Sequence, residues 1–422
     1  MKKLAKRFVA VILGWQVRRL AKRHDFKVVA IAGSIGKSST KLAIVKVLQQ
    51  KFRVQFQEGN YNDLVSVPLI FFGQQLPSLY NPLAWLSIFL KNESYIKKSY
   101  PYDIVVVELG SDGPGQLKDF KSYLKVDLGV LTAITPEHME FFKDLDDVAA
   151  EELTLTALSG RIIVNYDLCP PKYLKDVSNV ALSYGIDEPA DVRLVDVNFD
   201  NFSSSFKAEV HGKLFLSADH ESTTEPLLYG VLAAIATGYE LGMTAESIEK
   251  GLRELKPMSG RMQILAGINS SVIIDDTYNA SPEATKAALK TLYRLKAPQK
   301  IAILGNMNEL GSYSKAAHEE IGKYCDPKQL DLVVTVGPDA NQYLAKTAEQ
   351  KGCIVERFDS PYKAGGFLKG KIRSKAIVLA KGSQNGVFAE EAIKFLLANP
   401  TDAQKLVRQS PDWLKQKAKS FS

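Results

Sequence analysis

The residues with the most specific chemistry lie in a short glycine-rich segment, Gly33-Ser34-Ile35-Gly36-Lys37-Ser38. An apolar run typical of a strand precedes it, and a helical pattern at 40–49 follows it. A glycine turn between a strand and a helix N-terminus directs backbone N–H groups and the positive end of the helix dipole at one point, where an anion binds. Lys37 adds a positive charge, and Ser38 adds a hydroxyl for Mg²⁺. The segment therefore predicts a site for a nucleoside triphosphate.

The spacing of the two glycines leaves a second interpretation open. Only two residues separate Gly33 from Gly36, whereas the general P-loop of NTPases has four residues there. A structural glycine turn with a solvated Lys37 is the alternative. The sequence Lys-Ser-Ser-Thr that begins at Lys37 favours phosphate binding, and it adds Ser39 to the predicted ATP contacts.

Two further candidates stand where apolar runs end. Glu108 closes the run at 103–109, and His138 follows the run at 127–134. Ligands of open α/β sheets bind at the carboxyl ends of the strands. Glu108 is a candidate Mg²⁺ ligand, because an unpaired buried carboxylate would be costly. His138 is either a second metal ligand or an ordinary polar residue with satisfied hydrogen bonds, and its position favours the metal ligand.

Length and pattern predict an α/β protein with more than one domain. A chain of 422 residues with 45% hydrophobic residues can bury sizeable cores. Strand and helix patterns alternate, and a Pro/Gly-rich step near residue 260 separates two series of them. We predict a basic amphipathic helix at 1–26, a P-loop central domain with a mostly parallel sheet at 27–259, a Rossmann-like C-terminal domain at 260–400 with its last helix at 388–398, and a polar, loosely docked tail at 401–422.

The positive charge is concentrated at the N-terminus. The whole chain has a formal net charge of +7, and residues 1–25 alone carry eight Lys or Arg against one Asp. The remainder is near neutral, so nucleic-acid binding is not predicted. The predicted helix either lies on an anionic membrane surface or packs on the first domain. Its apolar run is too short to span a bilayer, and its apolar face consists of Leu4, Phe8, Val11 and Trp15.

Residues 76–102 are a second segment that could contact either a membrane surface or the rest of the protein. They are rich in aromatic and apolar side chains and end with a basic pair at 97–98. They form either a second membrane or partner contact or a buried helical hairpin, and the hairpin is favoured. The three cysteines have neither a paired nor a metal-binding spacing, which favours a reducing compartment. We therefore expect a cytoplasmic monomer whose contact with the inner membrane surface, where it has one, involves 1–25 and 76–102.

The order of motifs along residues 27–397 resembles that of the Mur ligases. The glycine-rich loop has the short form found in that family. Further matching blocks lie at 60–69, 106–115, 135–138, 259–261, 275–282 (Asp-Asp-Thr-Tyr-Asn-Ala-Ser-Pro), 304–311 (Leu-Gly-Asn-Met-Asn-Glu-Leu-Gly) and 381–383. The blocks at 275–282 and 304–311 resemble the dipeptide-adding branch of the family. Residues 76–102 exceed the corresponding family segment and are interpreted as an insertion.

This resemblance implies an ATP- and Mg²⁺-dependent carboxylate–amine ligase of peptidoglycan precursor synthesis. Such an enzyme adds a dipeptide such as D-alanyl-D-alanine to a muramoyl-peptide carboxylate through an acyl phosphate, so its partners are small-molecule peptides. The implied catalytic residues are Lys37, Glu108, His138, Arg261 and Asp276. The implied ATP contacts are Gly33, Ser34, Ile35, Gly36, Lys37, Ser38, Ser39, Arg261, Asp276 and Asn279. The implied metal ligands are Ser38, Glu108, His138 and Glu152, and the implied substrate contacts are Asn60, Asn62 and Ser383.

The sequence departs from the family pattern at three places. The family has a carbamylated lysine in the helix after the histidine motif, where one alignment places Glu152 and a shifted register places Ala150. A glutamate there offers the metal a carboxylate directly. The adenine-side asparagines are replaced at 225–230, so the base preference is open. With 26 residues before the first strand, we expect no separate domain for a UDP group, and the way a UDP-linked substrate is held is open.

Two other functions stay open at this point. One is an amide ligase of the same superfamily that acts on folylpolyglutamate or poly-γ-glutamate, although the dipeptide-ligase blocks argue against it. The other is a non-catalytic ATP-binding scaffold for cell-wall enzymes, which the basic N-terminus and the departures at 152 and 225–230 suggest. The joint presence of a P-loop lysine, two strand-end ligands and the C-terminal motifs favours an enzyme.

Overall fold

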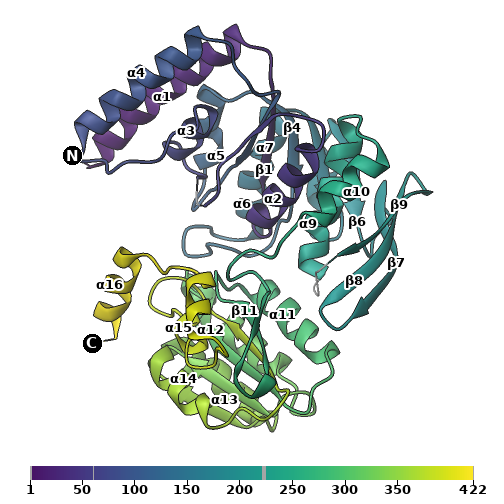
Figure 1. Cartoon of the computed structure of the whole chain (residues 1–422), viewed down its shortest axis with the longest axis vertical. Coiled ribbons are helices and arrows are strands. Elements are labelled where there is room, and N and C mark those ends of the chain that lie inside the picture. Colours follow the sequence, from purple (N-terminus) through teal and green to yellow (C-terminus); the bar gives the residue numbers. More distant parts are fainter. Residues whose placement is uncertain (1, 60, 221–224, 422) are drawn as a thin grey trace.

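The computed structural model describes the chain except residues 1, 60, 221–224 and 422, and it contains two α/β domains (Figure 1). In the described part of the chain, the first sheet has nine strands in the order β2-β3-β1-β4-β5-β6-β7-β8-β9. The second sheet has six, in the order β10-β11-β15-β12-β13-β14. Most neighbouring strands are parallel, and helices cover both sheets. The predicted fold class is therefore confirmed.

The central domain is built on the first sheet. Its strands are β1 (Lys27–Ala32), β2 (Val54–Gln55), β3 (Ile104–Glu108), β4 (Val126–Leu131), β5 (Ser159–Asn165), β6 (Val180–Gly185), β7 (Val192–Asp200), β8 (Ser203–Val210) and β9 (Lys213–His220). Its helices are α1 (Lys2–Arg23), α2 (Lys37–Leu48), α3 (Ser66–Phe71), α4 (Pro82–Lys97), α5 (Gln116–Asp119), α6 (Leu145–Glu152), α7 (Thr154–Leu158), α8 (Pro171–Leu174), α9 (Glu225–Glu240) and α10 (Ala245–Arg253).

Continuous apolar runs place the strands of this sheet in the interior. All five residues of β3 are buried, as are the last five of β1, because α2, α9 and α10 cover one face of the sheet and α1, α3, α5 and α7 cover the other. The strands β1, β3 and β4 are parallel neighbours, so their carboxyl ends lie at the same edge. That edge carries the glycine-rich loop, Glu108 and the segment before His138.

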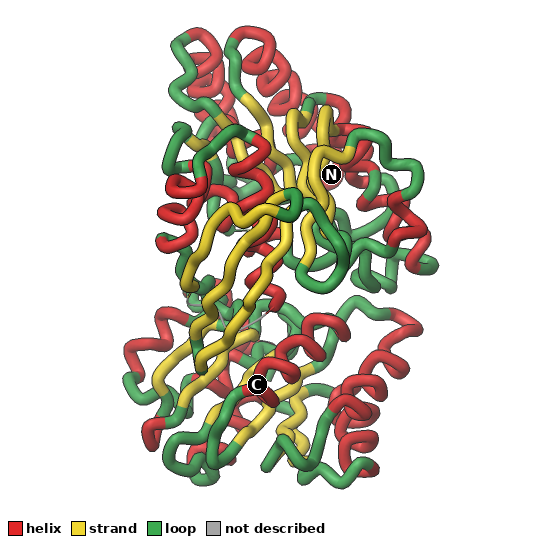
Figure 2. The backbone as a smooth tube through the Cα atoms, turned by 90° about the vertical axis from the view of Figure 1, so that its right-hand side faces the viewer, coloured by secondary structure: helices red, strands yellow, loops and turns green. Residues whose placement is uncertain are grey.

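The antiparallel part of the first sheet reaches toward the C-terminal domain. β7, β8 and β9 are antiparallel neighbours, and Figure 2 shows these strands extending down beside the second sheet. Near the turn between β7 and β8, the guanidinium of Arg294 lies 3.4 Å from the ring centroid of Phe199. Phe202 packs against the core of the C-terminal domain. This antiparallel part of the sheet therefore provides one contact between the domains.

The C-terminal domain repeats the strand–helix alternation on a smaller scale. Its strands are β10 (Gln263–Ala266), β11 (Val272–Asp276), β12 (Lys300–Gly305), β13 (Leu332–Val336), β14 (Val355–Phe358) and β15 (Ile377–Lys381). Its helices are α11 (Pro282–Arg294), α12 (Ser314–Tyr324), α13 (Ala345–Gln350), α14 (Pro361–Lys369), α15 (Glu390–Ile393) and α16 (Pro411–Ser420). The helix expected at 388–398 is thus wrong in length: only the four residues of α15 are helical, and backbone bonds tie the chain beyond them to β10.

The two segments with open interpretations form a pair of helices at one end of the molecule (Figure 1). α1 packs on the central domain through Val9, Leu13, Val17 and Leu20, which supports the prediction of a helix packed on the first domain. However, Phe8, Val11 and Trp15 stay exposed on its other side. The favoured hairpin at 76–102 is wrong, because one helix, α4, forms there and packs against α1 instead. No helix in the described ranges is long and apolar enough to cross a membrane.

The polar tail is not loosely docked, in contrast to the expectation. α16 buries Lys417 completely, and the ammonium lies 2.8 Å from Glu390 Oε1 and 2.6 Å from Glu391 Oε1. Both glutamates belong to α15 and are also buried. Charge pairing in the interior therefore holds this helix, together with an edge-to-face contact between the rings of Trp413 and Phe388.

Candidate active site

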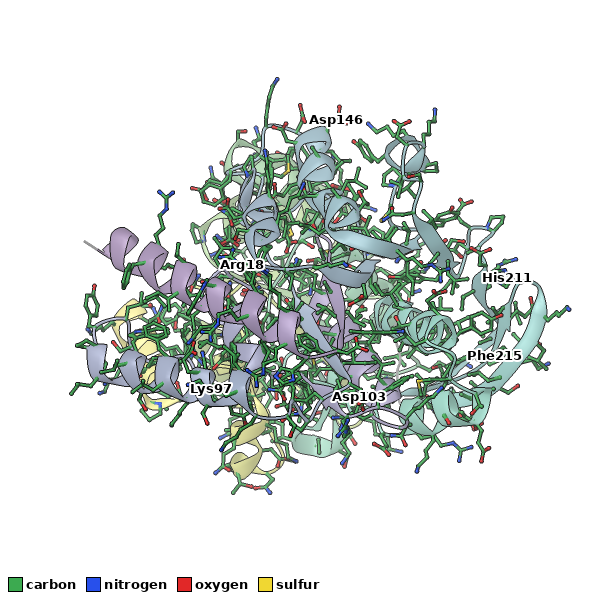
Figure 3. The ribbon with its side chains drawn as sticks, turned by 90° about the horizontal axis from the view of Figure 1, so that it is seen from above. Arg18, Lys97, Asp103, Asp146, His211 and Phe215 are labelled. Atoms are coloured by element: carbon green, nitrogen blue, oxygen red, sulfur yellow. The ribbon has the colours of Figure 1, made fainter. Side chains whose placement is uncertain are left out.

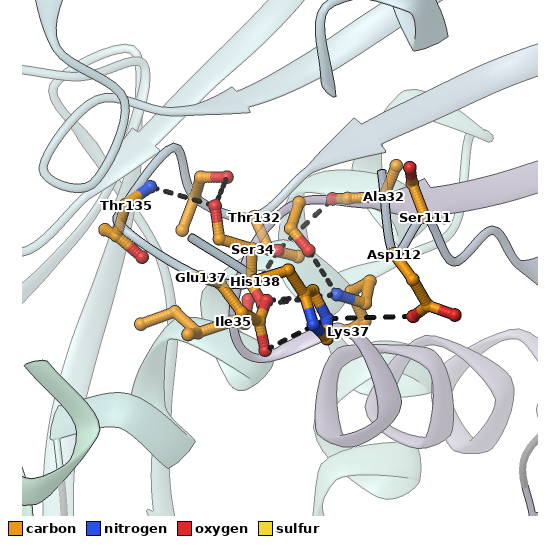
Figure 4. Close-up of polar contacts among 12 residues, drawn as sticks. Ala32, Ser34, Ile35, Lys37, Ser111, Asp112, Thr132, Thr135, Glu137 and His138 are labelled. Atoms are coloured by element: carbon orange, nitrogen blue, oxygen red, sulfur yellow. Dashed lines mark hydrogen bonds and ion pairs between the residues drawn. The ribbon is translucent and has the colours of Figure 1, made fainter. Parts of the chain in front are cut away.

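The glycine-rich loop has a backbone that only glycine adopts easily at two positions. Gly33 has φ +131° and Gly36 has φ +83°. A Cβ on Gly33 would lie 2.3 Å from Thr132 Oγ1 and 2.7 Å from the backbone N of Ala133, so the end of β4 blocks any side chain there. The same strand end holds the loop, since Thr132 Oγ1 donates to the carbonyl of Ile35 at 2.6 Å (Figure 4). The loop is therefore fixed in shape before any ligand binds.

Lys37 lies at the start of α2 with its ammonium turned back over this loop. Nζ donates to the carbonyls of Gly33 (2.5 Å) and Ser34 (3.2 Å), and Glu137 Oε2 lies 3.6 Å away. Burial alone would lower the pKa of Lys37, but the nearby carboxylates, Glu137 first, outweigh burial and raise it above its usual value. The lysine therefore stays positive, as an anion site requires.

Ser38 and Glu108 meet at the neighbouring strand end. Ser38 Oγ donates to Glu108 Oε2 at 3.0 Å, and both residues are buried. The ammonium of Lys41, one turn further along α2, lies 3.3 Å from the same oxygen and also donates to the carbonyl of Gly59. Glu108 therefore offers carboxylate oxygens beside the hydroxyl of Ser38, as the strand-end argument predicts.

His138 joins the site from the segment after β4, with a left-handed backbone (φ +53°). Its Nδ1 lies 2.7 Å from Glu309 Oε2 of the C-terminal domain, and its Nε2 lies 4.0 Å from Glu137 Oε1. Burial would lower the pKa of His138, but the hydrogen bond to Glu309 and the charge of Glu137 outweigh burial and raise it. The same Glu137 thus links the imidazole to Lys37 (Figure 4).

The two glutamates at the end of α6 have different environments. Glu151 accepts from Ser111 Oγ (2.8 Å) and from the backbone N–H groups of Gly115 and Leu117, so it holds a loop. Glu152 is buried, its Oε2 has no hydrogen-bond partner, and burial raises its pKa to about 7 despite the opposing charge of Lys37. The structure therefore brings Glu152 near the glycine-rich loop.

The C-terminal domain contributes an arginine and a buried ion pair. Arg261 follows the loop between the domains, and its guanidinium lies 4.1 Å from the ring centroid of Tyr278. Asp276 ends β11 and pairs with Lys381, at the end of the neighbouring strand β15, at 2.6 Å between Oδ2 and Nζ. Lys381 also donates to the carbonyl of Asn279 at 3.0 Å, which fixes the turn after β11.

These groups converge on one cavity of about 560 Å³ that both domains line. This volume lies within the usual range for small-molecule sites. The positive charge of Arg261 opposes the rise in the pKa of Lys37, so the two cations act on each other across the space between the domains. Two cations that share a cavity fit a polyanionic ligand such as a triphosphate. The predicted residues that line it are Ser34, Ile35, Gly36, Lys37, Ser38, Ser39, Asn62, Glu108, His138, Arg261, Asp276 and Asn279.

Of the other predicted residues, Gly33, Glu152 and Ser383 are not among those that line the cavity. Gly33 opens the loop and packs against Thr132 and Ala133, and Glu152 is buried beside Gly33. Ser383 is buried with its hydroxyl engaged, since it donates to the carbonyl of Ala280 and accepts from the backbone N–H of Asn308. Its substrate role stays a prediction. Asn60 lies outside the described residues.

The charged residues that sequence reasoning missed include Glu137, Glu309 and Lys381. Lys381 ends a buried apolar strand, just as Glu108 does, so the rule that found Glu108 would also have found Lys381. Glu137 precedes His138 and offered a similar signal. Glu309 reaches His138 from the other domain, and no local pattern indicates such a contact.

The side-chain oxygens of this site suit a divalent cation only together with a bound phosphate group. Within the described ranges, no three His, Cys, Asp or Glu side chains are close enough to hold a metal ion by themselves. Ser38 and Glu108 nevertheless offer oxygen atoms, and the buried Oε2 of Glu152 lacks a partner. Mg²⁺ is typically held by one or two carboxylates together with substrate phosphates and water. The donor set therefore suits a metal that arrives with a phosphate group.

Comparison with known proteins adds independent findings. The Mur ligase middle domain model matches residues 31–237, and the Mur ligase glutamate ligase domain model matches residues 260–384. The chain is 26% identical over 385 residues to a UDP-N-acetylmuramoyl-tripeptide–D-alanyl-D-alanine ligase of Bacillus subtilis, which covers 89% of this chain and 76% of the relative. It is 25% identical over 388 residues to the ligase of the same name from Escherichia coli, covering 89% and 78%. The structure superposes on the MurF ligase of Thermotoga maritima in complex with ADP with a TM-score of 0.74, 24% identity and coverage of 92% and 83%.

Proposed function

We propose that this chain, which belongs to the Mur ligase family, is an ATP-dependent ligase that adds a dipeptide such as D-alanyl-D-alanine to a muramoyl-peptide carboxylate in peptidoglycan precursor synthesis. The observation that carries the proposal is the meeting of Lys37 and Arg261, from different domains, in one cavity. A ligase of this kind must hold a triphosphate, a carboxylate and an amine together, and a cavity between two domains with cations from both meets that need.

The chemistry proceeds in two displacements. An oxygen of the substrate carboxylate attacks the γ-phosphorus of ATP, the bond to the β-phosphate oxygen breaks, and ADP leaves an acyl phosphate. The nitrogen of the incoming dipeptide then attacks the acyl carbon, and the tetrahedral intermediate expels phosphate as the amine loses a proton. Charge spreads over phosphate oxygens in both steps, so cations and N–H donors matter more than a protein nucleophile.

The chain's own residues divide this work between the domains. The N–H groups at the start of α2 and the ammonium of Lys37 hold the phosphates. Ser38 and Glu108 would hold Mg²⁺, which neutralises phosphate charge when bound, and Glu152 and His138 are the candidates for a second metal position. Ser34, Ile35, Gly36 and Ser39 complete the phosphate loop in this proposal, while Asn62 faces the substrate.

The C-terminal residues complete the site from the other side. Arg261 would contact the phosphates opposite Lys37, and Asp276 and Asn279 would orient the nucleotide through the turn that Lys381 fixes. Contact between the domains, seen at the pair of His138 and Glu309, excludes water from the hydrolysable acyl phosphate. We infer that the enzyme acts as a monomer in the cytoplasm, where ATP is available.

Phosphate release by the purified chain tests this function. ATP, Mg²⁺ and a panel of muramoyl-peptide and dipeptide substrates are supplied, and release that requires both the carboxylate and D-alanyl-D-alanine supports the ligase. Release that requires glutamate as the amine instead would replace the dipeptide ligase by a glutamate ligase. ATP binding without release under every combination would identify a non-catalytic scaffold and contradict the proposal.

A pair of lysine variants tests the site itself. We expect Lys37→Met to reduce turnover about a hundredfold or more, because it removes a cation that stabilises transferring phosphate. Lys46→Met, further along α2 and outside the cavity, is the matched control and should keep turnover. Equal activity of the two variants would remove Lys37 from the mechanism.

A further inference from the structure

The helix pair at the N-terminal end carries an apolar surface that the protein does not cover. Exposed large side chains recur three and four residues apart on α1 and on α4. They are Phe8, Val11 and Trp15 on α1 and Leu83, Leu86 and Leu90 on α4, and Phe8 (67%), Leu83 (77%) and Leu90 (63%) are the most exposed. Single exposed apolar residues are ordinary, but two regular stripes are not.

The packing of the helices places the two stripes side by side. Asn92 donates to Gln16 Oε1 at 2.9 Å, and Arg23 donates to the carbonyl of Lys97 near the end of both helices, so the helices run in the same direction. Trp85 and Ile88 of α4 face the protein interior together with Leu13 of α1. On helical spacing, Phe8 and Trp15 therefore stand at the level of Leu83 and Leu90, on the side of the pair that faces away from the sheet. We call this surface the outer face.

Cations predominate among the described charges around the outer face. α1 has eight Lys or Arg and no acidic residue. The acidic side chain of α4, Glu93, is engaged by Arg19 at 2.6 Å. Arg7, Lys22 and Lys91 are exposed. A surface with apolar stripes and flanking cations is complementary to anionic lipid headgroups above an acyl layer.

The position of the outer face leaves the cavity free. Figure 1 shows the helix pair at the end of the central domain that is remote from the C-terminal domain, and Figure 3 shows the two helices side by side when that end is viewed from above. A surface that touched this end would not obstruct the space between the domains.

We propose that the outer face docks this protein on the surface of a bilayer that contains anionic phospholipids. The stripes of α1 and α4 enter the boundary between headgroups and acyl chains, while Arg7, Lys22 and Lys91 remain at the level of the phosphates. A second copy of the chain is a weaker candidate for the occupant. A symmetric dimer through this face would bring two strongly basic helices together without acidic partners.

Vesicle flotation of the full chain tests the proposal. We expect the protein to float with vesicles of 70% phosphatidylcholine and 30% phosphatidylglycerol at low salt, and to stay behind with pure phosphatidylcholine. Binding should weaken as salt rises. Failure to float with the anionic vesicles would overturn the proposal.

A matched pair of double variants distinguishes docking through the outer face from non-specific hydrophobic adsorption. Phe8→Ser/Leu90→Ser removes one residue from each stripe and should lower the partition coefficient onto anionic vesicles by about tenfold or more. Leu214→Ser/Ile354→Ser changes two residues of the same exposure (62% and 67%) elsewhere on the molecule and should leave binding unchanged. Equal losses for both variants would overturn the proposal, as would a dimer in light scattering that only Phe8→Ser/Leu90→Ser abolishes.

Trp15 offers a direct readout of insertion. The variant Trp85→Phe/Trp413→Phe leaves Trp15 as the only indole of the chain. Its fluorescence should shift to shorter wavelength when anionic vesicles are added, because the exposed indole then leaves water. An unchanged spectrum at a lipid concentration that floats the protein would contradict docking through the outer face.

Discussion

The two terminal helices, α1 and α16, are both basic, but their cations have opposite environments. α1 packs on the protein through apolar residues and leaves most of its cations in water, whereas α16 docks through a lysine that is completely buried. The difference lies in the surface that each helix meets. α1 meets an apolar groove of the central domain, and α16 meets the paired carboxylates of Glu390 and Glu391. A basic terminal segment is thus no guide to its packing unless its partner is known.

The two ends of the chain also differ in their contacts with the candidate active site. Arg408, which precedes α16, donates to the carbonyls of Thr277 (2.6 Å) and Tyr278 (2.9 Å) and pairs with Glu390. Tyr278 in turn lies against the guanidinium of Arg261. The C-terminal tail therefore supports the turn that faces the cavity. The described side chains of α1 instead make their polar contacts with Asp63, Ser122 and α4, none of which lines the cavity, so we expect changes at the two ends to affect different properties.

The buried lysine of the tail should show the largest effect. Lys417→Met leaves Glu390 and Glu391 without their shared cation, and removing one partner of a buried pair typically costs about 3 to 5 kcal/mol. Urea unfolding at pH 7 measures the loss. Lys415→Met, on the exposed side of the same helix, should change the free energy of unfolding by less than about 0.5 kcal/mol. A similar small change for Lys417→Met would show that the tail is not held by charge.

Arg408 should link stability to catalysis. Arg408→Met removes hydrogen bonds from a charged donor to two carbonyls, which we expect to cost about 2 to 3 kcal/mol of unfolding free energy. Because the turn carrying Tyr278 loosens, turnover should also fall about tenfold with a higher KM for ATP. Arg408→Lys should not restore it, since lysine lacks the planar fork.

The control for Arg408 is an exposed arginine of the same domain. Arg373→Met, which removes a largely solvated side chain, should change neither stability nor turnover. If Arg408→Met lowers stability but leaves kcat and the KM for ATP unchanged, the tail is a structural element without influence on the cavity.

Acid should weaken the docking of the tail. Burial would raise the pKa of Glu391, but hydrogen bonds from Lys394 and Lys417 outweigh burial and hold the pKa below its usual value. A carboxylate with a lowered pKa stabilises the fold above its unfolded pKa of about 4.3, and this contribution is lost as the pH falls through the lower folded value. The difference in unfolding free energy between the wild type and Lys417→Met should therefore shrink between pH 5 and about pH 3. A constant difference would contradict the pairing.

Local sequence patterns predicted part of the fold and of the candidate site. Apolar runs that end in Gly or Glu predicted β1 and β3 and, with them, Lys37 and Glu108, because strand ends of a parallel sheet gather at one edge. Asp276 came only from the family resemblance. Local spacing also revealed the exposed apolar face of α1. It did not reveal the other, buried face through Leu13, because both faces of this helix are apolar and only the tertiary structure selects one.

Contacts between distant segments were beyond local patterns. Lys417 lies 26 positions after Glu391, and nothing in the sequence near either residue indicates their pairing. The same holds for Glu309 and His138, which come from different domains. The helix expected at 388–398 is short for a related reason, since the backbone of Leu396 and Ala398 is hydrogen-bonded to Ile268 and Ala266, which lie far away in the sequence.

The smallest expected effect concerns the ion pair of the N-terminal helices. Arg19 and Glu93 meet at 2.6 Å, but their side chains remain about one third exposed (34% and 29%), so water and salt screen the attraction. We expect Arg19→Met to cost about 0.2 to 1 kcal/mol of unfolding free energy. Leu13→Ala, on the buried side of the same helix, should cost about 2 to 5 kcal/mol because it leaves a cavity. A reversed order in urea unfolding would mean that charge holds α1 as it holds α16, and the contrast between the two ends would disappear.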